Sequence, residues 1–121
     1  MNQYFICGSR KFSEQIKELT KNLREEGFSI NSSINVPFKE VKNPSQFITN
    51  KKYIEEEILN AQTILMYNKD DDIDLLTAMN LQYALTQMKF IKLLFETERI
   101  ELTSFCKSLY YNVEIDKKWQ K

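Results

Sequence analysis

Histidine is absent from this chain of 121 residues, and cysteine, glycine, proline and tryptophan are scarce. Without an imidazole, the chain cannot form a His-based catalytic triad, an HExxH zinc site or an imidazole general base. The two cysteines, Cys7 and Cys106, make neither a zinc knuckle nor a disulfide framework. Any chemistry must therefore come from Asp, Glu, Asn, Ser, Tyr, Arg, Lys or a thiol, and we predict no metal and no cofactor.

Net charge and long apolar runs are also missing. Lys and Arg total 17, as do Asp and Glu, so no basic stripe supplies the counterion release on which nucleic-acid binding usually depends. The longest apolar runs, at 64–67 and 91–95, fall well short of the roughly 20 residues that span a bilayer. Residues 1–12 lack the charged and apolar regions of a signal peptide. We therefore expect a soluble, cytoplasmic protein with no nucleic-acid or membrane partner.

Short apolar, β-prone runs alternate with segments of helical periodicity along the chain. The expected strands cover residues 3–7, 28–36, 63–67 and 89–95, and the expected helices cover residues 12–26, 47–60 and 75–88. This alternation predicts a three-layer α/β fold, in which a mostly parallel sheet of four to five strands carries helices on both faces. The length is that of one domain, which we expect to span residues 1–121.

Several boundaries follow from capping and turn residues. Ser13 suits the N-cap of the first helix, and Gly27 suits its C-terminal end. Residues 33–46 hold both prolines and are expected to form a long irregular connection of the kind that often carries function. Near the C-terminus we expect a helix over 99–109, followed at 110–115 by a fifth strand or an edge.

The turn Gly8-Ser9-Arg10 directly follows the first expected strand. In open α/β sheets ligands bind outside the carboxyl ends of the strands, where a glycine lets backbone amides approach an anion. Arg10 and Lys11 add positive charge. There is no GxGxxG motif and no P-loop, which argues against a dinucleotide site and against an ATPase. This turn is the first candidate ligand site, and a tight structural turn with solvated cations is the alternative.

An acidic turn, with Asp70, Asp71, Asp72 and Asp74, precedes the helix at 75–88. Carboxylates at a helix N-terminus complement the helix dipole and cap free amides, and we assign this structural role to Asp70 and Asp71. Asp72 and Asp74 are expected at the same sheet edge as Gly8, so sugar hydroxyls are an alternative partner for them. A divalent cation is the lesser option, because no further oxygen ligands follow by spacing.

The helix at 75–88 is apolar around most of its circumference, unlike a surface helix with one apolar stripe. It is therefore buried within the fold or packed against a second subunit, and we predict a homodimer or higher homo-oligomer through it. Asn80 is the one polar residue embedded among its apolar side chains. A buried amide needs partners, so Asn80 either bonds a neighbour or faces a pocket. Cys7 is expected to be a small hydrophobe in its strand.

Three segments together resemble the nucleoside 2-deoxyribosyltransferase family and, more distantly, the SLOG nucleotide-binding domains. Residues 4–12 resemble the first strand and glycine turn, 50–68 the helix and strand that follow, and 72–96 the signature segment. Seven residues of that segment align with the family's signature: Asp72, Asp74, Thr77, Ala78, Tyr83, Ala84 and Lys89. The resemblance implies a flavodoxin-like fold and a ligand pocket formed by Gly8, Ser9, Arg10, Asp72, Asp74, Asn80 and Tyr83.

The chain departs from that family at the residue that carries its chemistry. The family's glutamate attacks the anomeric carbon of a deoxynucleoside and forms a glycosyl-enzyme, whereas this position holds Asn80, a far poorer nucleophile. Leu75 and Leu76 replace small residues, and Gln82 and Met88 replace glycines. The sequence therefore predicts a catalytically inactive relative that binds a nucleoside, a nucleotide or a nucleotide-derived ligand. Two alternatives stay open: an active N-glycosidic-bond transferase or hydrolase using another carboxylate, and a protein-interaction module with a vestigial pocket.

Overall fold

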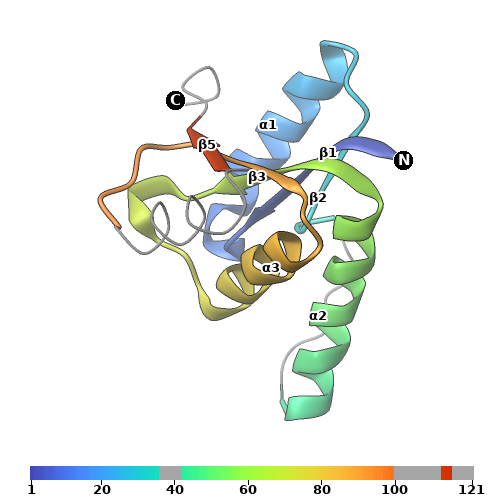
Figure 1. Cartoon of the computed structure of the whole chain (residues 1–121), viewed down its shortest axis with the longest axis vertical. Helices are drawn as coiled ribbons and strands as arrows, with labels where there is room; N and C mark the ends of the chain where they lie inside the picture. The colour runs from blue at the N-terminus through green and yellow to red at the C-terminus, as the bar shows by residue number, and fades with distance from the viewer. Residues whose placement is uncertain (36–41, 100–112, 116–121) are drawn as a thin grey trace.

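The computed structural model describes residues 1–35, 42–99 and 113–115. Within these residues five parallel strands form one sheet in the order β2-β1-β3-β4-β5 (Figure 1). The strands are β1 (Asn2–Gly8), β2 (Ile30–Ser32), β3 (Ala61–Tyr67), β4 (Phe90–Leu93) and β5 (Val113–Ile115). The predicted parallel sheet is confirmed, and β5 falls inside the segment expected as a fifth strand or an edge. The helix expected over 99–109 lies almost wholly outside the described residues.

Among the described residues, three α-helices and two single 3-10 turns connect the strands. They are η1 (Arg10–Phe12), α1 (Ser13–Glu25), α2 (Pro44–Leu59), η2 (Lys69–Asp71) and α3 (Leu75–Thr86). Helix α1 covers one face of the sheet, while α2 and α3 lie side by side on the other (Figure 1). The three-layer α/β prediction is therefore confirmed, and strand order 2-1-3-4-5 is that of flavodoxin-like folds.

Local chemistry moved several of the predicted boundaries. The second strand ends at Ser32 because the chain turns there, with Asn35 N–H donating to Ser32 O at 3.1 Å. Helix α2 starts at Pro44, three residues before the predicted start. Asn43 caps the helix, and the φ angle of Pro44 suits its first turn. The prediction of Ser13 as an N-cap is wrong, since η1 leads directly into α1, Phe12 holds the N-cap position and Ser13 is the first residue of the helix.

Alternating side chains of the strands divide the core between the two faces. From β1, Phe5 and Cys7 pack with α2 and α3, while Ile6 packs with α1. Burial raises the pKa of the Cys7 thiol well above its ordinary value, so it stays protonated. Cys7 is thus the small strand hydrophobe that the sequence predicted.

Helix α3 is buried along one side only. Leu81, Ala84 and Leu85 face the core, whereas Leu75 is 69% exposed. The helix ends at Thr86, and Met88 adopts a left-handed backbone (φ 57°), the conformation that favours glycine at a helix end. Among the described helices, none is both long and apolar enough to cross a membrane.

Candidate functional site

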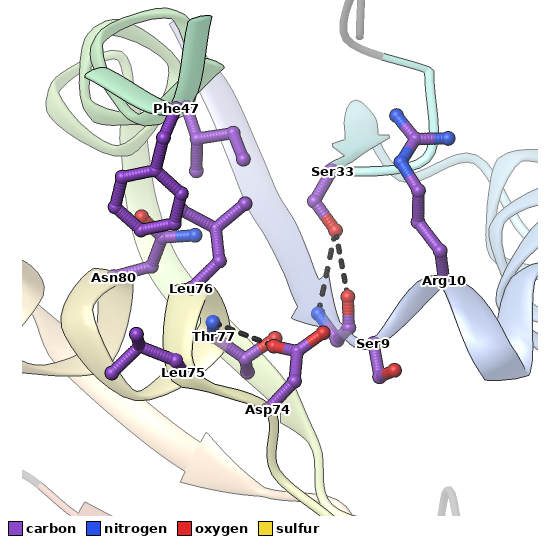
Figure 2. Close-up of a pocket in the computed structure, with 11 residues that line it drawn as sticks. Ser9, Arg10, Ser33, Phe47, Asp74, Leu75, Leu76, Thr77 and Asn80 are labelled. Atoms are coloured by element: carbon purple, nitrogen blue, oxygen red, sulfur yellow. Dashed lines mark hydrogen bonds between the residues drawn. The ribbon is translucent and has the colours of Figure 1, made fainter. Parts of the chain in front are cut away.

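A cavity of about 280 Å³ opens at the carboxyl edge of the sheet. The chain leaves β1 toward β2 on one side and later returns to β3 on the other, and ligands of such folds bind at this switch point. Five of the seven predicted ligand residues line the cavity, namely Gly8, Ser9, Arg10, Asp74 and Asn80. The remaining wall consists of Ser33, Phe47, Ile54, Leu75, Leu76 and Thr77 (Figure 2).

Gly8 is required by packing between the sheet and α1. A Cβ atom at this position would lie 2.7 Å from Cδ1 of Ile16 and 2.9 Å from Cβ of Tyr67, closer than real side chains approach. Its amide N–H donates to Ser33 Oγ at 3.3 Å, and this hydroxyl contacts Gly8 O at 3.4 Å. The expectation that this glycine frees its amide for an anion is therefore not met, because Ser33 occupies that amide.

The polar groups of Ser9, the next residue of the turn, also form hydrogen bonds within the turn. Ser9 caps η1, its Oγ accepting from Lys11 N–H at 3.3 Å, and Ser9 O accepts from Phe12 N–H at 2.9 Å. Arg10 extends from the turn beside Ser33 (Figure 2). Partial burial lowers the pKa of the Arg10 guanidinium from its ordinary value, but arginine remains cationic at neutral pH. The turn thus contributes one cation and a rigid frame to the cavity.

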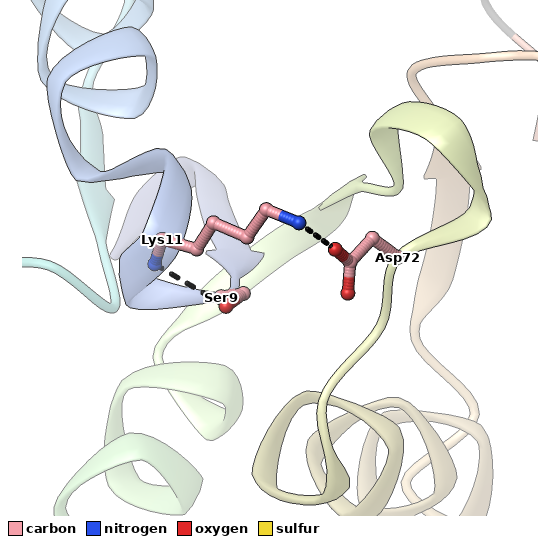
Figure 3. Close-up of polar contacts among 3 residues, drawn as sticks. All are labelled: Ser9, Lys11 and Asp72. Atoms are coloured by element: carbon pink, nitrogen blue, oxygen red, sulfur yellow. Dashed lines mark hydrogen bonds and ion pairs between the residues drawn. The ribbon is translucent and has the colours of Figure 1, made fainter.

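Asp72, the sixth predicted residue, lies outside the cavity lining. Its carboxylate forms an ion pair with the Lys11 ammonium, which joins the turn after β1 to the loop after β3 (Figure 3). The hydrogen bond and charge of Asp72 raise the pKa of Lys11. Both side chains are solvent-exposed, so the pair adds little stability. Tyr83, the seventh predicted residue, packs against the α2–α3 side of the core.

Asp74 and Asn80 come from α3 and differ in how their polar atoms are used. Asp74 is the N-cap, and its Oδ1 accepts from Thr77 N–H at 2.8 Å. Asn80 is 2% exposed, and its Oδ1 has no hydrogen-bond partner among the described residues. Because buried polar atoms are nearly always paired, the orphan carbonyl of Asn80 is the most unusual feature of the cavity wall.

The loop between β3 and α3 is held by a second asparagine. Asn68 is fully buried, its Nδ2 donating to Phe95 O and its Oδ1 accepting from Phe95 N–H, both at 2.9 Å. Asp71 Oδ2 accepts from Glu98 N–H at 3.1 Å. These bonds hold the left-handed residues Asp70 (φ 57°) and Asp71 (φ 55°) in place. Asp71 thus has a structural contact, but helix capping, which the sequence analysis assigned to Asp70 and Asp71, is performed by Asp74.

Six lining residues lie outside the predicted ligand set, and Phe47 and Ser33 show the two extremes of how well the sequence signals such residues. Phe47 stands seven positions before Ile54, so it shares the inward stripe of α2, and this spacing could have revealed it. Ser33 offered no comparable signal. It reaches Gly8 because Ser33 N–H donates to Ile6 O at 2.8 Å, a long-range pairing of β2 with β1.

The lining offers few catalytic groups. Within the described residues, Asp74 is the sole carboxylate of the cavity, whereas most glycosidases place two carboxylates around the scissile bond. No group of three or more Cys, Asp or Glu side chains in the described part of the chain is placed to hold a metal ion. The arrangement therefore suits recognition by a cation, hydroxyl groups, an amide and apolar side chains.

Among solved structures, one of similar architecture is the CMP N-glycosidase BcmB of Clostridium botulinum. The fold resembles that of a CMP N-glycosidase. The TM-score is 0.56 over 96% of this chain and 91% of that chain, with 16% sequence identity. No protein-family model matches the sequence, and no curated protein is significantly similar to it in sequence. At this identity the likeness establishes the three-layer α/β fold.

Proposed function

We propose that the protein binds a nucleoside or nucleotide in the switch-point cavity and does not cleave it. The observation that carries the proposal is the division of the cavity into two chemically distinct ends. Arg10 supplies a cation at one end, while Phe47, Leu76 and Asn80 form a largely apolar wall at the other (Figure 2). A nucleotide has the same division, because an anionic phosphate lies at one end and a flat heterocycle at the other.

The middle of the cavity suits a sugar. Ser9 and Asp74 lie between the two ends (Figure 2), and Asp74 has a second carboxylate oxygen beyond the one that caps α3. Carboxylates readily accept hydrogen bonds from hydroxyl groups. The architecture of a nucleotide N-glycosidase, BcmB, supports the same class of ligand for this fold.

Loss of turnover follows from the proposed position of Asn80. The resemblance to the deoxyribosyltransferases supports this step, because it aligns the amide of Asn80 with the family's nucleophilic carboxylate. An amide neither forms a stable glycosyl ester nor stabilises an oxocarbenium ion by negative charge. The protein would then hold its ligand intact.

Isothermal titration calorimetry with nucleosides, nucleoside monophosphates, cyclic nucleotides and ADP-ribose derivatives tests the binding. We expect a monophosphate to bind with a submillimolar Kd, and Arg10→Met to weaken it roughly tenfold, as for the loss of one charge-assisted hydrogen bond. Lys21→Met removes an exposed cation of α1 outside the cavity and serves as the matched control. Absence of binding at millimolar ligand contradicts the proposal.

The second candidate function is N-glycoside hydrolysis or transfer, favoured by the carboxylate of Asp74 in the cavity. Chromatography of nucleosides and nucleotides incubated with the protein would detect free base. Asp74→Asn is the matched variant, because asparagine caps a helix as well as aspartate but cannot act as a nucleophile or a base. Free base released by the wild-type protein and not by this variant would establish the second candidate and overturn the first.

We also propose that α3 contributes to a homodimer. Leu75, the first residue of α3, is 69% exposed, and Met88, two residues beyond its last, is 65% exposed, so large apolar side chains meet solvent near both ends of the helix. Light scattering should give twice the mass of the chain, and Met88→Lys should shift the population toward monomer. A monomer at micromolar concentration would remove the dimer and leave heterologous contact through α3, the protein-interaction alternative, as the remaining use of this surface.

A further inference from the structure

The amide of Asn80 is built into the cavity wall at an energetic cost to the free protein. The side chain is 2% exposed and its Oδ1 lacks a partner among the described residues. A buried carbonyl that loses its water without gaining a donor destabilises the state that contains it. Because Oδ1 is closed to solvent in the free protein, the amide must turn about its Cβ–Cγ bond to present this atom to the cavity. A ligand that brings a donor to the turned amide would gain affinity that another ligand would not.

The neighbours of Asn80 indicate which part of a ligand lies there. Phe47 and Leu76 line the same cavity as Asn80 (Figure 2). An aromatic ring and aliphatic side chains favour a flat heterocycle over a hydroxylated sugar, because sugar hydroxyls buried against them would lose hydrogen bonds to water. The groups suited to hydroxyls, Ser9 and Asp74, lie further toward Arg10 (Figure 2).

We infer that Asn80 is a base-reading residue, whose amide hydrogen-bonds the edge of a nucleobase packed beside Phe47 and Leu76. This inference rests on the proposed nucleotide-binding function and adds the recognition of the base. A primary amide offers one acceptor and two donors. It can therefore pair with adjacent donor and acceptor groups on the edge of either cytosine or uracil, and in both cases the orphan carbonyl gains an N–H partner. The ligand class assigned here is thus a nucleotide whose base carries a hydrogen-bond donor and an acceptor side by side, and the cytosine and uracil nucleotides serve as its probes.

Calorimetry with four ligands separates base reading from contact with the sugar. The ligands are cytidine 5′-monophosphate, uridine 5′-monophosphate, the 2-pyrimidinone ribonucleotide that lacks an exocyclic group at carbon 4, and ribose 5-phosphate. We expect the first two to bind with similar affinity and the third roughly tenfold more weakly, because its edge leaves the Asn80 carbonyl without a donor.

Asn80→Leu should abolish this difference by weakening the two natural nucleotides roughly tenfold, and it should leave the affinity for ribose 5-phosphate unchanged. Asn80→Ala provides the same comparison if the leucine variant fails to fold, as judged by thermal melting. Lys21→Met, outside the cavity, should change none of the four affinities.

Two results would overturn the inference while leaving nucleotide binding intact. One is equal affinity of the wild-type protein for the 2-pyrimidinone ribonucleotide and cytidine 5′-monophosphate. The other is a loss of ribose 5-phosphate affinity in Asn80→Leu as large as the loss for the nucleotides, which would place Asn80 against the sugar. If none of the three nucleotides binds to the wild-type protein, the proposed function itself fails, and base reading fails with it.

Discussion

The two walls of the cavity, the turn after β1 and helix α3, differ in how completely their polar groups are hydrogen-bonded. In the turn after β1, the amide of Gly8 bonds Ser33 and the hydroxyl of Ser9 bonds the backbone of Lys11. In the wall formed by α3, Asp74 caps the helix but Asn80 keeps a buried carbonyl without a partner. The first wall is arranged for stability, and the second retains an unsatisfied group that a ligand could use. Substitutions on the two walls should therefore have opposite effects on the free protein.

The largest expected effect is at the first wall, in Gly8→Ala. The new methyl group would overlap Ile16 and Tyr67, so we expect the free energy of unfolding to fall by about 3 kcal/mol, as for overpacking in a core. Urea denaturation measures the loss. Gly27→Ala is the control, since its Cβ would meet nothing within 4 Å and only the left-handed backbone (φ 99°) opposes it, at about 1 kcal/mol. Equal losses in both variants would contradict the role of packing at Gly8.

The second-largest loss of stability is expected at Asn68, which holds the loop between β3 and α3 in place. Asn68→Leu removes both hydrogen bonds to the Phe95 backbone and leaves those buried groups unpaired, at a cost of about 2 kcal/mol. Asn35→Ala, at an exposed asparagine, should stay within about 0.5 kcal/mol of the wild type. An unchanged urea midpoint for Asn68→Leu would show that the loop does not depend on the two hydrogen bonds between Asn68 and the Phe95 backbone.

Asn80→Leu should act in the opposite direction to Asn68→Leu. Replacing an unpaired buried amide by an apolar side chain of similar size removes a desolvation penalty, so the free energy of unfolding should stay constant or rise by about 1 kcal/mol. Both leucine variants can be measured in the same denaturation series. A loss at Asn80 as large as that at Asn68 would mean that the amide of Asn80 is satisfied, and the contrast between the walls would disappear.

The smallest effect is expected at the Lys11–Asp72 pair, which joins the two walls at the surface. Because Asp72 raises the pKa of Lys11 in the folded state, the pair stabilises the protein at neutral pH. That contribution is lost as the pH rises above the ordinary lysine value toward the raised one. Asp72→Asn should therefore narrow the difference in melting temperature between pH 7 and pH 11. Exposure keeps this change small, and a large destabilisation at pH 7 would contradict the account.

The sequence was sufficient to predict the layered fold and the edge at which the cavity lies. Apolar periodicity set the alternation of strands and helices, and the position of Gly8 after β1 followed from it. The reason for that glycine could not be predicted, because its contacts with Ile16 and Tyr67 arise only when α1 packs on the sheet. The start of α2 was misplaced although Asn43 and Pro44 are typical of a helix start, since the surrounding polar residues suggested a loop.

Individual side chains of the site were harder to predict than its location. Asp72 and Asp74 are two residues apart, yet one pairs with Lys11 at the surface and the other lines the cavity. Asp70 and Asp71, which precede them, adopt a left-handed backbone. Aspartate is enriched in this conformation, but the sequence does not show which of the four aspartates adopt it. Asn80 was recognisable as a buried amide from its apolar neighbours, but its missing partner emerged only from the packed structure.

The proposed function requires the cavity to hold an intact nucleotide. Proton nuclear magnetic resonance of cytidine 5′-monophosphate incubated with the wild-type protein tests it in one measurement. We expect saturation transfer from the protein to the base and sugar protons of the nucleotide, with no resonances of free cytosine after prolonged incubation. Free cytosine would contradict the proposed loss of turnover, and absence of saturation transfer would contradict binding.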